Sequence, residues 1–263
     1  MDTSKFHLVA AGTLNVASDT TYPPQEFQDP NNPTSFIGSD LDLINEIAKR
    51  NCLTATIDKA NFDDIIPALT TPALGQQRYD LSISAFSITS DRLQKVDMVP
   101  YFQAGESLLV APGNPQNIKS LDDLCGKSVA VEKGTVELDE LNGVNDGSNG
   151  GDAKCASNHI DILSFESQDD VVTQLLNGRV VATYQDEPVT GYYVSKNPGK
   201  VQQGPITIAP SPEGIVMRKD NPDLETAVKK ALCDMLHDGT YAKILTHWGQ
   251  QSGELPASQF VCS

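Results

Sequence analysis

The chain has 263 residues, with 19 Lys and Arg against 35 Asp and Glu, and its formal net charge is −16. This length allows one large domain or two medium ones, each with its own core. The acidic balance disfavours nucleic acid and anionic membrane surfaces as partners. No apolar run is long enough to span a bilayer, and residues 1–5 lack the apolar core of a signal peptide. If the protein is exported, we expect its targeting segment to have been removed.

Strand and helix patterns alternate along the first part of the chain. Period-two alternation and short apolar runs predict strands, whereas apolar residues spaced by three and four predict helices. The expected elements are strand 8–17, a helix over 41–48 opened by Ser39 or Asp40, strand 54–57, helix 62–69 and strand 81–85.

The same alternation starts again after Pro112 and predicts a second α/β domain. The segment Pro112–Pro115 is a candidate crossing point between the two domains. The expected elements are a helical turn 121–124, strand 128–131, a helix from Thr135 to 141, strand 160–165, a helix from Ser167 to a stop at Gly178, strand 180–184, and two helices from 224 onward that are broken at Gly239.

The five cysteines lie at positions 52, 125, 155, 233 and 262. Their spacing does not match a zinc site, and we expect neither a metal nor a cofactor. A Cys125–Cys155 disulfide would anchor the glycine-rich loop at 145–151 and indicates an oxidising compartment. A second bridge, Cys233–Cys262, would fix the tail and leave Cys52 without a partner. The alternative is that all five are reduced in a cytosolic protein.

The segment from Asp80 to Arg92 predicts a binding site for a carboxylate. A short strand is followed by hydroxyl residues, with Ser87 five positions before Arg92. A guanidinium is a planar fork of donors that matches a carboxylate, and open α/β sheets bind ligands at the carboxyl ends of their strands. The alternative is a polar loop closed by a surface ion pair between Asp91 and Arg92.

Further polar and aromatic residues follow other predicted strands. Each could also have a purely structural role, Tyr22 and Phe62 as core residues and Asp186 as a helix cap. Together they favour one pocket. These segments are Ser18–Pro24, the helix start at Phe62, Glu132–Thr135 and Gln185–Glu187.

With these motifs in this order, the chain resembles the polar amino-acid-binding proteins of bacterial ABC importers, the family-three periplasmic solute-binding proteins. The resemblance implies an α/β fold of two lobes, the type II periplasmic-binding-protein fold, with mixed sheets flanked by helices and two hinge strands. It places the discontinuous first lobe at 1–109 plus 214–263 and the second lobe at 110–213. The motifs that carry it are Ala17–Phe27, Ile37–Leu43, Phe62–Leu69, Asp80–Arg92, Leu121–Thr135, Val180–Asp186, Asp238–Tyr241 and Trp248–Gly249.

The resemblance also implies roles for individual residues. Arg92 matches the clamp for the ligand α-carboxylate, aided by Ser87 and the region of Thr135, and Asp186 matches the acceptor of the α-ammonium. Ser84 is also expected among the ligand-binding residues. Two positions depart from many relatives. Where this chain has Ala85, the relatives often have Ser or Gly, and where it has Val136, they often have Thr, Ser or Gly. The remaining expected ligand-binding residues are Tyr22 and Phe62 around the side chain, Asp19 and Glu132 near its tip, and Gln185 beside Asp186.

Two acids near the side-chain tip would favour a cation between aromatic rings. We therefore expect a free L-amino acid as ligand, with arginine first, then lysine or ornithine, and glutamine as the neutral alternative. The implied partner is the membrane permease of an ABC importer. We expect a monomer in the periplasm or outside the cell, with or without a lipid anchor.

An enzyme on the same fold, similar to cyclohexadienyl dehydratase, is another alternative, with Glu132 or Glu187 as its acid. The scattered histidines at 7, 159, 237 and 247 give no catalytic constellation. A ligand-sensing domain of a membrane receptor is a third alternative.

Overall fold

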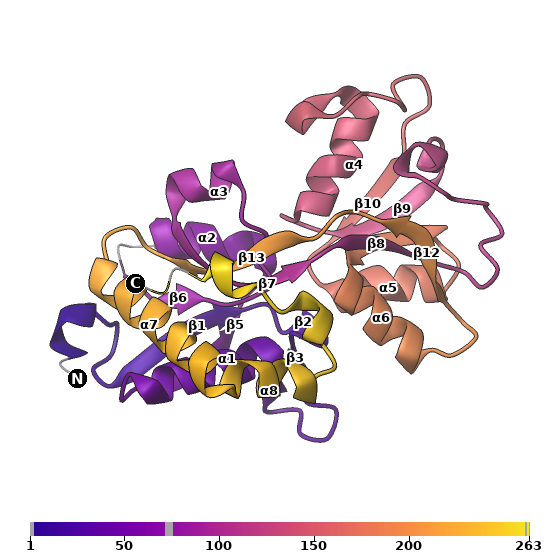
Figure 1. Ribbon diagram of the computed structural model, residues 1–263. Coiled ribbons are helices and arrows are strands. Elements are labelled where there is room, and N and C mark those ends of the chain that lie inside the picture. Colours follow the sequence, from indigo (N-terminus) through magenta and orange to yellow (C-terminus); the bar gives the residue numbers. More distant parts are fainter. Residues whose placement is uncertain (1–2, 72–75, 261, 263) are drawn as a thin grey trace. The chain divides into compact units, whose positions relative to one another are not determined.

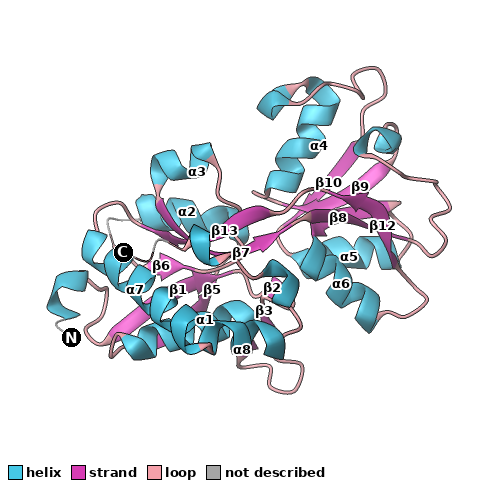
Figure 2. Cartoon of the chain, in the orientation of Figure 1, coloured by secondary structure: helices cyan, strands magenta, loops and turns pink. Residues whose placement is uncertain are grey.

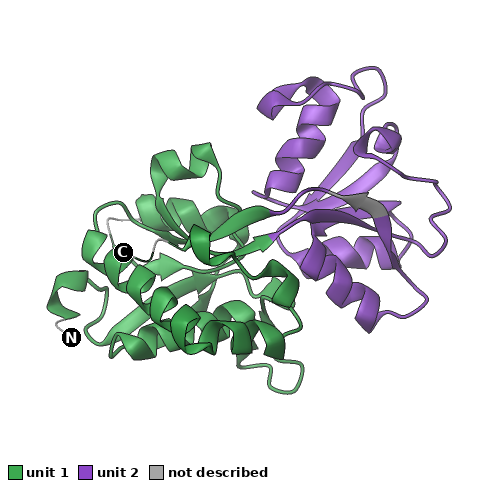
Figure 3. Cartoon of the chain, viewed as in Figure 1, with its two compact units in different colours: residues 1–103, 211–263 green, residues 104–210 purple. Residues whose placement is uncertain are grey.

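The computed structural model describes residues 3–71, 76–260 and 262. The chain divides into two compact units, and it crosses between them twice (Figure 3). Unit 1 comprises residues 1–103 and 211–263, and unit 2 comprises residues 104–210. Both boundaries fall earlier than the expected ones after 109 and 213. The strand Glu106–Val110 explains the first shift, because its ladder partners lie in unit 2.

Unit 1 is built on a mixed five-stranded sheet with the order β5-β1-β6-β13-β7 (Figure 1). Strand β1 pairs in parallel with β5 and β6, whereas β13 pairs antiparallel with β6. A small antiparallel sheet, β2-β3-β4, adds to it. The strands are β1 (Thr13–Ser18), β2 (Thr21–Tyr22), β3 (Glu26–Gln28), β4 (Phe36–Ile37), β5 (Thr54–Lys59), β6 (Leu81–Ser82), β7 (Asp97–Ala104) and β13 (Ser211–Met217).

Helices flank the sheet of unit 1 on both faces (Figure 2). Helix α2 covers one face, where Phe62, Ile65 and Leu69 pack with Ala17 of β1 and Val216 of β13. The helices are α1 (Ser39–Arg50), α2 (Phe62–Thr70), α3 (Ser90–Lys95), α7 (Pro222–Asp238) and α8 (Thr240–His247), with 3-10 turns at Thr3–Phe6, Gln251–Gly253 and Ala257–Gln259.

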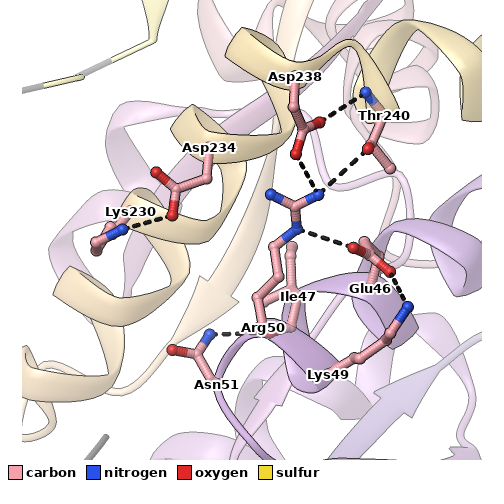
Figure 4. A network of polar contacts seen from close by, with 9 residues as sticks. All are labelled: Glu46, Ile47, Lys49, Arg50, Asn51, Lys230, Asp234, Asp238 and Thr240. Atoms are coloured by element: carbon pink, nitrogen blue, oxygen red, sulfur yellow. Dashed lines mark hydrogen bonds and ion pairs between the residues drawn. The ribbon is translucent and has the colours of Figure 1, made fainter.

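Helix α1 is tied to the C-terminal helices by a polar network around Arg50 (Figure 4). The Arg50 guanidinium donates to Glu46 Oε1 at 2.9 Å within α1, and its Nη2 lies 2.8 Å from Asp238 Oδ2 at the end of α7. The same nitrogen donates to Thr240 Oγ1 at the start of α8. Between these helices Gly239 adopts φ 77°, the left-handed conformation in which glycine is favoured, so the predicted break is present.

Unit 2 is built on a second mixed five-stranded sheet, with the order β10-β9-β11-β8-β12. Apolar residues of β8, β9 and β11 form its core with Leu141 of α4. The strands are β8 (Glu106–Val110), β9 (Ser128–Glu132), β10 (Asp161–Phe165), β11 (Ala182–Asp186) and β12 (Gln202–Thr207). The helices are α4 (Val136–Asp146), α5 (Gln168–Leu176) and α6 (Glu187–Lys196), with 3-10 turns at Leu121–Leu124 and Ser148–Gly150.

Two predicted strands are shorter than expected, and in both cases a residue with positive φ interrupts the extended backbone. Strand β1 begins only at Thr13, because Thr13 N donates to Ala10 O and Gly12 takes φ 77°. Strand β6 ends at Ser82 and does not continue to Ala85, whose φ of 46° is incompatible with extended backbone. Helix α4 extends to Asp146, beyond the expected end at 141, and is capped by Gly147 in the left-handed conformation.

Both expected disulfides are present, one in each unit. Cys125 and Cys155 are bonded in unit 2 with Cα atoms 5.1 Å apart, and Cys233 and Cys262 are bonded in unit 1 with Cα atoms 5.6 Å apart. Cys52 is an exposed free thiol. The Cys125–Cys155 bridge closes the segment that contains the glycine-rich loop, as the sequence indicated.

Candidate ligand-binding site

Unit 1 gathers its expected site residues just beyond the carboxyl ends of the parallel strands β1, β5 and β6. This is the edge at which open α/β sheets bind ligands. Most of these residues have little exposed surface, and Arg92 is half-buried. They are Asp19, Tyr22, Phe62, Ser84, Ala85, Ser87 and Arg92.

Arg92 is held by the loop that precedes it and by two aromatic rings. Its Nη1 donates to the Ser87 carbonyl oxygen at 2.8 Å. Its guanidinium carbon lies 5.5 Å from the centroid of the Phe62 ring and 5.1 Å from that of Phe86. These two rings stack on each other at 4.2 Å. Phe86, which the sequence analysis missed, therefore helps to orient the guanidinium.

The Asp19 carboxylate is fixed by its own loop. Its Oδ1 accepts hydrogen bonds from Thr21 N at 3.1 Å and Thr21 Oγ1 at 2.8 Å. The backbone N–H of Asp19 donates to Ser84 Oγ at 2.9 Å, and the Ser84 hydroxyl donates to Glu26 Oε1 at 2.8 Å. Ser84 thus connects the loops that follow β1 and β6. Tyr22, on β2, is buried, with 6% of its surface exposed.

A buried acidic network lies behind these loops, and the sequence analysis did not assign it. Asp40 Oδ2 accepts from Tyr101 Oη at 2.5 Å and from Ala85 N at 3.2 Å. Gln25 Nε2 donates to Glu213 Oε2 at 2.6 Å. Burial raises the pKa of Asp40 to about 6, and burial together with the nearby Asp40 raises the pKa of Glu26 well above its usual value. The only signal in the sequence was that Asp40 opens a predicted helix.

In unit 2, three expected residues lie where β9 passes into α4. Glu132 ends β9 and is 2% exposed. Thr135 is the N-cap of α4, because its Oγ1 accepts from Leu138 N at 3.3 Å, and the same hydroxyl donates to Glu132 O at 2.9 Å. Val136 is the first helical residue. Backbone N–H groups at such a helix start favour an anion.

Gln185 and Asp186 end β11, the next strand of the same sheet. Gln185 is fully engaged, because it accepts from Gln168 Nε2 and donates to Ser107 O and Thr190 Oγ1. Asp186 is the N-cap residue of α6 but makes no side-chain cap hydrogen bond.

Opposite Asp186 in the β8–β11 ladder lies Glu106, another acid that the sequence analysis missed. Burial, with the neighbouring Glu137 and Glu140, raises its pKa to about 9. Glu140 accepts from Tyr184 Oη at 2.6 Å on the same face. Residues 182–186 therefore end in a strongly acidic region of unit 2.

The described part of the chain contains no group of three or more His, Cys, Asp or Glu placed to hold a metal ion. Among the same residues, no helix combines the length and apolar character that a membrane span requires. The site chemistry is that of an arginine, carboxylates, hydroxyls and aromatic rings.

Comparison with known proteins identifies the family. A model of bacterial extracellular solute-binding proteins, family 3, matches residues 14–251. The chain belongs to this family. Its two mixed α/β units are those of the two-lobed periplasmic-binding-protein fold.

Relatives of this family 3 solute-binding protein include the lysine/arginine/ornithine-binding periplasmic protein of Escherichia coli K12, 31% identical over 245 residues, which cover 88% of this chain and 85% of the relative. A solved ancestral arginine-binding protein bound to arginine is 35% identical, with a TM-score of 0.80 over 90% of this chain and 98% of the other. A solved structure of an ancestral arginine-binding protein bound to glutamine is 34% identical, with a TM-score of 0.80 over 92% of this chain and 99% of the other. These relatives are named as binding proteins, and this chain is a solute-binding protein of the same family.

Proposed function

We propose that this family 3 solute-binding protein captures a basic L-amino acid outside the cytoplasm and delivers it to the membrane permease of an ABC importer. Arginine is the favoured ligand, followed by lysine and ornithine. The permease and the compartment follow from the family, whose relatives named above include a periplasmic protein.

The invariant parts of an amino acid have a matching group in each unit. Arg92, with its fork of donors, would bind the α-carboxylate together with Ser87 and the start of α4 at Thr135 and Val136. Asp186, which lies opposite Glu106 in the β8–β11 ladder, would accept from the α-ammonium. Glutamine, lysine and arginine share these groups, so this part of the site does not choose between them.

The choice of a basic side chain rests on one observation, the burial of Asp19 and Glu132. Each carboxylate belongs to a residue only 2% exposed, at the positions expected near the side-chain tip. Taking carboxylates out of water is costly, and a cationic ligand would offset part of that cost. A neutral ligand would not, and an acidic ligand would increase it. The rings of Tyr22 and Phe62 would add cation–π attraction of about 0.5–2 kcal/mol.

The names of two relatives support the choice of a basic ligand. One is named for lysine, arginine and ornithine, and another for arginine. Glutamine is the second candidate, because an ancestral arginine-binding protein with the same fold has been solved with glutamine bound.

Calorimetric titration tests the proposal directly. The protein is first unfolded and refolded to remove any ligand carried through purification, and then titrated with L-arginine, L-lysine, L-ornithine, L-histidine and L-glutamine. We expect arginine to bind most tightly. Tighter binding of glutamine would replace the basic ligand by the neutral one, and no binding of any amino acid would reject the function.

A further inference from the structure

The loop Ser84–Ser87 has a backbone conformation that its own sequence does not favour. Ala85 takes φ 46°, a left-handed conformation that costs free energy for a residue with a Cβ. Such strained residues persist only where the surrounding structure fixes them, and they concentrate at ligand sites. The contacts that fix Ala85 are therefore informative.

Two buried side chains hold the N–H of Ala85. It donates to Asp40 Oδ2 at 3.2 Å and to Tyr101 Oη at 3.3 Å, and the Tyr101 hydroxyl donates to the same Asp40 oxygen at 2.5 Å. Asp40 opens α1 and Tyr101 lies in β7, so the loop is fixed from two separate elements. Asp40 is 1% exposed and Tyr101 is 0% exposed. The Ala85 N–H is thus already occupied, and its contribution to a ligand would be indirect.

The loop is also fixed to the first residues of β13, which follow the crossing from unit 2. Ile88 N donates to Pro212 O and Gly214 N donates to Phe86 O, both at 2.8 Å. Glu213, between them, forms a bridge with Ser87, and its Oε2 lies 3.3 Å from Tyr101 Oη. The side chains of Asp40 and Tyr101 and the backbone of β13 therefore fix the same loop, residues 85–88.

The loop in turn positions the arginine. Ser87 O accepts from Arg92 Nη1 at 2.8 Å, so a shift of Ser87 would move the guanidinium with it. A continuous chain of hydrogen bonds and backbone leads from Asp40 and Tyr101 through Ala85 and Ser87 to Arg92. A buried carboxylate in such a chain is a poor source of stability compared with apolar packing, whereas its hydrogen bonds fix the geometry of the loop.

We propose that Asp40 and Tyr101 are positioning residues for ligand binding, which hold the Ser84–Ser87 loop and, through it, Arg92 in the conformation that receives the ligand carboxylate. The inference rests on the proposed function, because it assigns the carboxylate of an amino acid to Arg92. Neither side chain needs to touch the ligand. Their removal should weaken binding without a matching loss of stability.

Asp40→Asn is the most informative variant, because it keeps the size of the side chain and removes a buried charge. Ala85 N and Tyr101 Oη both donate to the same Asp40 oxygen, and a neutral amide oxygen accepts these two hydrogen bonds more weakly than a carboxylate oxygen does. We expect arginine to bind about tenfold more weakly or worse in calorimetry, while the unfolding temperature at pH 8 stays unchanged or rises. A purely structural residue would lower both together, so a parallel loss of affinity and unfolding temperature would overturn the assignment.

Tyr101→Phe, with Tyr241→Phe as its matched control, tests the second residue. Both tyrosines are 0% exposed in unit 1, and the Tyr241 hydroxyl bonds only backbone groups, Tyr101 O and Leu255 N, among the partners given by the structure. We expect Tyr101→Phe to weaken arginine binding about tenfold and Tyr241→Phe less than about twofold. In the ligand-free protein, hydrogen exchange at the Ala85 amide should become faster in Tyr101→Phe and not in Tyr241→Phe.

The outcomes separate this inference from the function on which it rests. Wild-type protein that binds no amino acid would overturn both. Wild-type protein that binds arginine, with Asp40→Asn and Tyr101→Phe binding equally well, would overturn the positioning role alone and leave the function intact. If Tyr101→Phe fails to fold, the arginine affinity of Asp40→Asn and the Ala85 exchange rate in that variant still decide.

Discussion

Arg92 offers the sharpest test of the proposed binding site. The structure shows contacts of this residue that contribute to folding, and we propose in addition that it binds the ligand carboxylate. It donates to Ser87 O and lies over the Phe62 and Phe86 rings. A hydrogen bond from a charged donor contributes about 1.5–3 kcal/mol, less for a half-exposed group, and a cation–π contact about 0.5–1 kcal/mol at a partly exposed site. Arg92→Ala should therefore lower the free energy of unfolding by about 1–3 kcal/mol.

The same substitution should affect ligand binding much more strongly. Loss of one partner of a buried charge-assisted pair costs about 2–5 kcal/mol, which weakens binding of arginine by a factor of at least about 30. Arg92→Lys separates the two effects. The ammonium keeps the charge above the rings but cannot form the two-pronged contact with a carboxylate. We expect its stability within about 1 kcal/mol of wild type and its affinity at least about tenfold weaker.

Calorimetry with L-arginine gives the affinities, and thermal unfolding without ligand gives the stabilities. Arg50→Lys is the matched control, because Arg50 also lies in unit 1 and also makes charged contacts, with Glu46 and Asp238 (Figure 4). It should lower the unfolding temperature and leave the affinity unchanged. Arginine binding to Arg92→Lys with wild-type affinity would refute the carboxylate clamp, whatever the stability of the variant.

Three further predictions concern acidic side chains. Glu132→Gln should weaken arginine more than glutamine in calorimetry, because only the cation loses a charged partner; equal losses would remove the basis for a basic ligand. Burial raises the pKa of Glu26, so the folded chain holds a proton that the unfolded chain releases, and stability falls as pH rises above the ordinary carboxyl pKa of about 4. Glu26→Gln should then raise the unfolding temperature more at pH 8 than at pH 5, and no difference between the two would contradict the shift. Hydrogen bonds from Thr240 and the nearby Arg50 lower the pKa of Asp238 to about 2, so its contribution to stability is present above pH 4 and is lost as pH falls toward 2. Asp238→Asn should lower the unfolding temperature at pH 7 and have little effect at pH 2; an equal effect at both would show that the charge is not involved.

The elements best predicted from the sequence are those whose signals are local. Helix α1 presents the apolar stripe of Leu41, Ile44 and Ile47 to the core, and its first and last turns carry charges of the favourable sign. The break between α7 and α8 is marked by one glycine. Thr135 and Ser167 cap their helices through their own hydroxyl groups. In each case the residues that decide the structure lie within a few positions of one another.

The loop after β6 shows where such signals fail. The alternation of Leu81, Ile83 and Ala85 predicted strand, and all three are buried, but the chain leaves the sheet after Ser82. The loop that replaces the end of the strand is fixed by two hydrogen bonds that Ala85 N donates to side chains of other elements, Asp40 and Tyr101. Asp40 and Tyr101 are 45 and 16 positions away from Ala85, and no local sequence pattern indicates these contacts. The alternation of apolar residues alone therefore could not exclude the longer strand.

The same reasoning explains why the sequence indicates candidate ligand-binding residues but not the buried groups that lie behind them. Arg92 and Asp186 follow strands, and their residue types alone indicate the chemistry. Gln25 and Glu213 are 188 positions apart, and their hydrogen bond exists only because the chain returns to unit 1 through β13. A buried glutamate in an isolated sequence segment has no partner that could be recognised. The return of the chain therefore supplies both strand β13 of the sheet and the acid that completes the network behind the site. Substitutions at Glu213 should therefore be interpreted as changes to that network rather than to a strand.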